Sequence, residues 1–199
     1  MKLGKMLLAT IGVAVLLGTL VGAASARNLS VSNQQLRAQF RELRFSGLFG
    51  TGSCQVTAEG SFHSRTIAKV VGQLVGYITR GILGPCATGT VTVLNETLPW
   101  HVRYSGFAGT LPNIASIRAN IINVAFRVRT PEGFNCLARS TPEQPAIVTF
   151  NRDVATNAVT SAVIGGTVET TCGFAGTWSS DSGPVRLLLT GELIFIRLI

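Results

Sequence analysis

The chain has 199 residues, 46% of them hydrophobic and only 13% charged, and its formal net charge is +8. This length excludes two comfortable domains and leaves room for one domain with a substantial core. The positive charge favours anionic partners such as cell-wall polymers, acidic lipid surfaces or nucleic acid, although the arginines are scattered along the sequence.

Residues 1–26 have the features of an export signal. Lys2 and Lys5 precede a long apolar run, and Ala24-Ser25-Ala26 matches a signal-peptidase site. An uncleaved membrane anchor is the alternative, but the run is shorter than the roughly 18 to 20 residues of a membrane span. We therefore expect a secreted protein, extracellular or associated with the cell envelope. We expect the mature chain to begin at Arg27, to carry a net charge of +6 and to have no transmembrane helix after cleavage.

The mature region contains four cysteines, an even number that predicts two disulfides in an exported chain. Three pairings are possible. We favour Cys54 with Cys86 and Cys136 with Cys172, because each bridge then closes a loop within one half of the chain. No Cys-x-x-Cys spacing is present, so zinc binding and thioredoxin-like chemistry are poor alternatives.

The first half of the mature chain mixes two hydrophobic periods. Residues 28–46 alternate in short runs whose phase slips near Arg41, which predicts one or two strands with a β-bulge. Residues 54–63 alternate cleanly and predict a half-buried strand. Residues 65–80 instead carry an apolar stripe at helical spacing, with Ser64 as a possible N-cap, and predict one short amphipathic helix.

Period-two alternation dominates the rest of the chain. We predict strands over residues 88–96, 97–107, 116–129, 134–139 and 146–152. Gly165-Gly166 predicts a hairpin turn, and the apolar C-terminal segment predicts a buried strand or a strand pair turning at Thr190-Gly191. Residues 27–199 should therefore form one mainly β domain, an antiparallel β-sandwich or barrel with a single short amphipathic helix.

No catalytic, metal or phosphate motif is present in the sequence. It lacks a Gly-x-Ser-x-Gly elbow, its glutamates are dispersed, and its two histidines have no metal-ligand spacing. We expect no cofactor, and the sequence favours a protein without catalysis while leaving enzymatic activity open. We do not expect nucleic-acid binding, because the phenylalanines among the arginines of residues 36–45 alternate inward as readily as outward.

The candidate binding residues are two histidine–arginine pairs. His63 and His101 are each followed two positions later by an arginine, Arg65 and Arg103. Alternation over residues 98–105 assigns Trp100 and its apolar neighbours to the core. It places His101 and Arg103 on the opposite face, about 6.5 to 7 Å apart. Such a face is either a ligand-binding patch or a solvated surface.

The segments "FHSRTIAKVVGQLVGYITR" and "TVLNETLPWHVRYSGFAGTLPNI", the terminal "IRLI" and the A-x-A signal resemble exported proteins of unknown function from high-GC Gram-positive bacteria. The resemblance covers most of the mature chain. It implies export and a single domain, and it carries no activity or catalytic residue.

Three hypotheses for the function follow. The first is a secreted, disulfide-stapled β-sandwich with a non-catalytic structural or binding role at the cell envelope, where anionic cell-wall polymers are the expected partner. The second is a small apolar-ligand carrier with a cavity between the sheets, beneath the predicted helix. The third is a secreted hydrolase that depends on His101 or His63. The sequence leaves the oligomeric state open, although an apolar terminal strand could pair with a second sheet.

Overall fold

The computed structural model describes residues 28–48, 50–173 and 176–199, so the predicted signal peptide lies outside the described residues. The described chain contains fifteen strands and one 3-10 turn, and no α-helix. The elements are β1 (Asn28–Val31), β2 (Gln35–Gly47), β3 (Gly50–Phe62), β4 (Thr66–Ala68), β5 (Leu74–Thr88), β6 (Thr90–Val93), η2 (Asn95–Thr97), β7 (Trp100–Thr110), β8 (Asn113–Ile122), β9 (Ala125–Arg129), β10 (Asn135–Arg139), β11 (Ala146–Arg152), β12 (Val159–Thr170), β13 (Gly176–Ser180), β14 (Val185–Leu187) and β15 (Ile196–Leu198).

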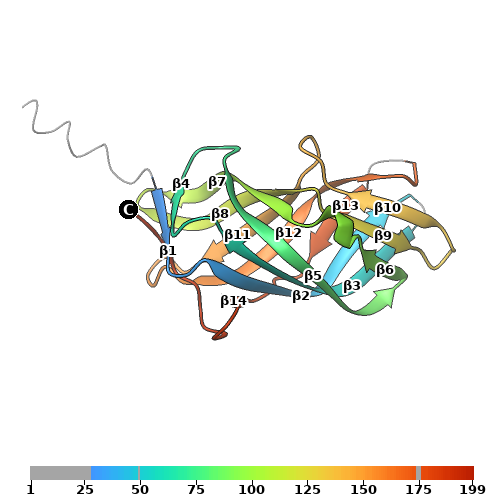
Figure 1. Cartoon of the computed structure of the whole chain (residues 1–199), viewed down its shortest axis with the longest axis horizontal. Helices are drawn as coiled ribbons and strands as arrows, with labels where there is room; N and C mark the ends of the chain where they lie inside the picture. Colours follow the sequence, from blue (N-terminus) through green and yellow to red (C-terminus); the bar gives the residue numbers. More distant parts are fainter. Residues whose placement is uncertain (1–27, 49, 174–175) are drawn as a thin grey trace, which may run out of the picture.

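Eight strands close into a ring. They follow one another in the order β11, β8, β7, β5, β3, β2, β13 and β12, and β12 pairs back with β11. Every pairing in the ring is antiparallel. The predicted antiparallel β fold is therefore confirmed, and the ring makes it a barrel (Figure 1).

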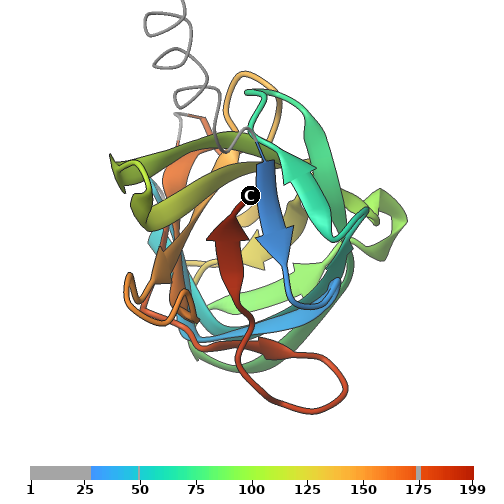
Figure 2. The ribbon, with the colours of Figure 1, turned by 90° about the vertical axis from the view of Figure 1, so that its left-hand side faces the viewer.

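The two ends of the barrel differ. At one end, β1 pairs with β15 and β4 in a three-stranded sheet that lies across the mouth, which we call the lid (Figure 2). Toward the other end, β12 leaves β11 and pairs with β10, which carries β9 and β6. The wall of the barrel is thus built from different strands at its two ends.

One hydrophobic cluster fills the barrel and continues under the lid. Four aromatic side chains meet at its centre: Phe45 lies 4.7 Å from Trp178 and 4.9 Å from Phe126, and Phe126 lies 5.5 Å from Trp100 between ring centroids. The lid contributes the buried side chains of Leu29, Val31, Ile67 and Ile196. Burial of such side chains contributes about 1.5 to 3 kcal/mol each, so the lid is part of the core.

The predicted helix over residues 65–80 is wrong. This segment forms β4, a turn and the first half of β5. Its apolar residues are mostly β-branched, which favours strands, and Gly72 has a φ of 83°, outside the helical region. Gly76 packs so closely on β3 that a Cβ atom there would lie 2.4 Å from the carbonyl oxygen of Ser61. The glycine therefore serves close strand packing.

The predicted hairpin at Gly165-Gly166 is also wrong, because β12 runs through both glycines without a turn. Gly165 pairs with Ile147 on one side, and Gly166 pairs with Trp178 on the other. The C-terminal turn does form, with Gly191 at a φ of 73° and its amide bonded to the carbonyl of Leu187. The strands on either side of it, β14 and β15, join different sheets.

Several local predictions are confirmed. The β2–β3 pairing shifts register between Phe40 and Leu43, around the bulge predicted near Arg41. The disulfides pair as favoured, and the bridge of Cys54 with Cys86 joins the neighbouring strands β3 and β5. The buried face of β3 is also the predicted one; its members are Cys54, Val56, Ala58, Gly60 and Phe62.

Candidate functional site: a ring row on a basic wall

His63 and His101, 38 positions apart in sequence, lie on either side of Tyr77. The ring centroids of His63 and Tyr77 are 4.6 Å apart, those of Tyr77 and His101 are 5.2 Å apart, and both pairs meet at 63°. Tyr77 and His101 are register partners on β5 and β7, while His63 directly follows β3. We call these three side chains the ring row.

The ring row lies on the outer surface of the barrel. Its strand neighbours Phe62 and Val102 are buried, and successive side chains of a strand point to opposite faces. His63 is exposed, and Tyr77 and His101 are half-buried. The row is therefore open to a partner from solvent.

The two predicted arginines, Arg103 and Arg65, lie in different surroundings. Arg103 follows His101 on the outer surface of β7, and its Nη1 donates a 3.0 Å hydrogen bond to the carbonyl oxygen of Gly72. Arg65 is exposed, and its backbone carbonyl accepts a 2.8 Å hydrogen bond from the amide of Val31. The structure thus joins His63, His101 and Arg103 around one surface, whereas the backbone of Arg65 supports the lid.

The stretches of sequence that carry the ring row contain basic residues and no acidic ones. Residues 60–95 and 97–131 contain seven arginines and lysines and no aspartate or glutamate. These stretches supply β5, β7 and β8, three neighbouring strands of the barrel. We call the outer surface of these strands, together with the side chain of Lys69 just before β5, the basic wall; its cations are Lys69, Arg80, Arg103 and Arg118.

The acidic group closest in register to the basic wall already has partners. Glu59 on β3 is buried and pairs with Arg37 at 2.7 Å and with Arg80 at 3.6 Å. Lys69 contacts an aromatic ring, with Nζ 5.6 Å from the centroid of Phe107. Arg103 and Arg118 are exposed on the wall. Cationic groups on this surface are therefore available to an external anion.

Tyr77 and the basic wall were not predicted from the sequence. Tyr77 lies in the segment with helical spacing, and that pattern gives no sign of its register with His101. The absence of acidic residues from two long stretches was a usable signal, because it shows that the arginines, although scattered, are unbalanced in one part of the chain. The ring row itself depends on strand pairing and has no signature in the local sequence.

The interior of the barrel offers little room for a ligand. One cavity of about 50 Å³ is lined by apolar side chains that include Phe40, Phe62 and Phe150. A second, of about 30 Å³, lies beside Trp178, whose indole N–H has no acceptor among the described residues. About 10 to 15 Å³ of such volume holds one water molecule, so each cavity has room for a few waters.

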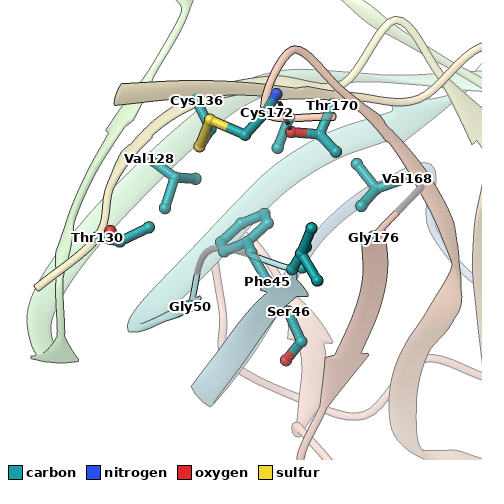
Figure 3. Close-up of a pocket in the computed structure, with 13 residues that line it drawn as sticks. Phe45, Ser46, Gly50, Val128, Thr130, Cys136, Val168, Thr170, Cys172 and Gly176 are labelled. Carbon is teal, nitrogen blue, oxygen red and sulfur yellow. Dashed lines mark hydrogen bonds between the residues drawn. A yellow bond between two sulfur atoms is a disulfide. The ribbon is translucent and has the colours of Figure 1, made fainter. Parts of the chain in front are cut away.

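A third small pocket, whose lining residues are drawn in Figure 3, lies among β9, β10 and β13 at the end of the barrel opposite the lid (Figure 1). It measures about 40 Å³ and is lined by the disulfide of Cys136 with Cys172 together with Phe45, Val128 and Val168. Among the described residues, those that line it carry no ionisable side chain.

A shallow hollow of about 700 Å³ on the outer surface contains three glutamates, Glu96, Glu143 and Glu169. Arg139, also in its lining, lies 2.5 Å from a carboxylate oxygen of Glu169, and this hydrogen bond lowers the pKa of Glu169 from its ordinary value. A general acid needs a raised pKa near the working pH. Glu169 is therefore poorly suited to proton donation.

Within residues 28–48, 50–173 and 176–199, no three metal-binding side chains gather into a site. In the same part of the chain, no helix has the length and hydropathy of a membrane span. Comparisons with family models, curated proteins and solved structures gave no match to this chain.

Proposed function

We propose that this chain is an exported, non-catalytic binding module of the cell envelope that holds anionic polymers on its basic wall. The observation that carries the proposal is the ring row, set among cations in a part of the chain without acidic residues. The A-x-A signal and the resemblance to exported proteins support an envelope location. The two disulfides are compatible with it, because such bonds persist in oxidising compartments.

The chemistry of the wall suits an extended polyanion. Arginine binds phosphate and carboxylate groups through two parallel hydrogen bonds, and Arg103 and Arg118 are exposed for this contact. The ring row crosses three strands that lie about 4.8 Å apart, so it offers apolar contacts along a line across the barrel. An unbalanced positive surface also speeds the encounter with an anionic partner.

The two alternative functions have less support. The carrier hypothesis placed its cavity beneath a helix that is absent, and the interior cavities of about 50 and 30 Å³ are small for an organic ligand. The hydrolase hypothesis needs a nucleophile or a second acid–base group beside His63 or His101. The side chain that both histidine rings contact is Tyr77, and each contact is a packing of ring edge on ring face. Assays against ester, glycan and phosphodiester substrates would support a hydrolase if activity fell on replacing either histidine.

Co-sedimentation of the mature protein with purified cell-wall material tests the proposal. We expect binding at low salt that weakens as salt screens the wall. Arg103→Ala and Arg118→Ala should each weaken it by about two- to fivefold, the range expected for exposed ion pairs. Arg44→Ala is the matched control, since it removes the same charge from β2, outside the wall. Salt-insensitive binding, or equal effects of all three variants, would refute the proposal.

A further inference from the structure

Two exposed valines stand at the lid end of the basic wall. Val70 and Val71 lie in the turn between β4 and β5, and they are 58% and 73% exposed. Adjacent apolar side chains with this exposure contribute little to the core. Both side chains are therefore free to contact a partner outside the fold.

The turn is held in this conformation from both sides. The amide of Gln73 donates to the carbonyl of Val70 at 3.1 Å, which closes the turn. The amide of Gly72 donates to the carbonyl of Tyr104 at 2.8 Å, and the amide of Tyr104 donates to the carbonyl of Gln73 at 2.9 Å. Arg103 adds its 3.0 Å bond to the carbonyl of Gly72. The fold thus keeps both valines projected from the surface.

Two cations lie at the base of the turn. Lys69 immediately precedes Val70, and its ammonium group lies over the ring of Phe107. Arg103 reaches the turn from β7. No acidic residue occurs between residues 60 and 95. An exposed apolar turn with cations at its base matches the surface of an anionic bilayer, where acyl chains lie beneath phosphate groups.

We infer that the turn of residues 69–73 docks the protein on an anionic lipid bilayer. Val70 and Val71 enter the boundary between headgroups and acyl chains, and Lys69 and Arg103 contact headgroup phosphates. This inference rests on the proposed function, because it uses the same basic wall and names a lipid surface as a partner. A water-soluble polyanion would engage the cations alone, whereas a bilayer also removes the two valines from water.

Vesicle co-sedimentation tests the inference. The mature protein should bind vesicles of phosphatidylglycerol and phosphatidylcholine, and should bind phosphatidylcholine vesicles much more weakly. The double variant Val70→Ser/Val71→Ser should lower binding to the anionic vesicles by about tenfold and leave cell-wall binding unchanged. Leu48→Ser, a 62% exposed residue in the β2–β3 turn at the opposite end, is the matched control and should bind vesicles as the wild type does.

A gain of signal provides a second measurement. Trp100 and Trp178 are buried, so a tryptophan at position 71 would dominate the change in fluorescence on binding. Val71→Trp should bind anionic vesicles more tightly and shift its emission to shorter wavelength. Unchanged emission, or wild-type vesicle binding by the double serine variant, would overturn the inference. The proposed function would survive that result if Arg118→Ala still weakened cell-wall binding, and it would fail separately if it did not.

Discussion

Tyr77 packs its ring against His101 at a centroid distance of 5.2 Å and an angle of 63°, an edge-to-face contact between register partners on β5 and β7. Edge-to-face pairs contribute about 0.5 to 1.5 kcal/mol beyond the area they bury. A double-mutant cycle with Tyr77→Leu and His101→Ala should therefore give a coupling energy in the lower half of that range, measured by denaturant unfolding. The control is a second cycle in which Thr149→Ala takes the place of His101→Ala. Thr149→Ala should show no coupling energy with Tyr77→Leu.

Arg152 is a buried cation whose hydrogen bonds support the lid. It is 8% exposed, and it donates to the carbonyl of Ile114 and to the side-chain oxygen of Asn157. The carbonyl of Asn157 in turn accepts the amide of Ile196 on β15. Arg152→Ala should lower the free energy of unfolding by about 2 to 4 kcal/mol, because it leaves buried acceptors unpaired and opens a cavity.

Exposed Arg127 is the control for this measurement, and Arg127→Ala should change stability by about 0.5 kcal/mol or less. Chemical denaturation of both variants decides the matter. Similar losses would show that the buried hydrogen bonds of Arg152 contribute little to the fold.

The two tryptophans of the core should respond differently to the same substitution. The indole N–H of Trp100 donates to Thr97 Oγ1 at 2.9 Å, whereas that of Trp178 has no acceptor in the described chain. Trp100→Phe should therefore cost about 1 kcal/mol more than Trp178→Phe, because only the first change removes a hydrogen bond. Urea unfolding of the two variants measures the difference, and equal or reversed losses would contradict the expectation.

Stability should fall with acid because several carboxylates are held ionised in the folded state. Hydrogen bonds from Arg139 lower the pKa of Glu169, those from Arg44 and Ser53 lower the pKa of Glu42, and the ordinary value of both is 4.5. The unfolded chain therefore binds more protons than the folded chain as the pH falls below about 4.5. The free energy of unfolding should be greatest above this pH and should decrease through the folded-state pKa values.

Glu169→Gln is the direct check on this pH dependence. It removes one titrating group, so the slope of the free energy of unfolding against pH should be shallower in the variant below about pH 4.5. Above that pH the two proteins should show parallel profiles. An unchanged slope would mean that Glu169 binds protons equally well in both states.

The sequence predicts most strands of this fold, because alternation records which face of each strand is buried. The bulge between Phe40 and Leu43 and the buried face around Trp100 follow from this pattern alone. The helix prediction failed because the apolar residues from Ile67 to Ile78 follow helical spacing although the chain turns at Gly72, and the decision lay in the close contact of Gly76 with β3. That contact is tertiary and leaves no separate mark in the local sequence.

The candidate site was only partly predictable for the same reason. Alternation placed His101 and Arg103 on one face, but the approach of His63 depends on the order of β3, β5 and β7 in the barrel. Closure of the ring depends on the pairing of β13 with β2, strands from opposite ends of the chain, which local patterns do not encode. The export prediction concerns residues outside the described chain and remains a prediction.

The lid pairs segments that are synthesised at very different times. Leu29 on β1 is the register partner of Leu198 on β15. The central strand of the lid therefore gains its second neighbour only after almost the whole described chain has been made. Contacts so distant in sequence form slowly, since a long loop must close before they are made. The lid can therefore be completed only after β15, the last strand of the described chain, has been made.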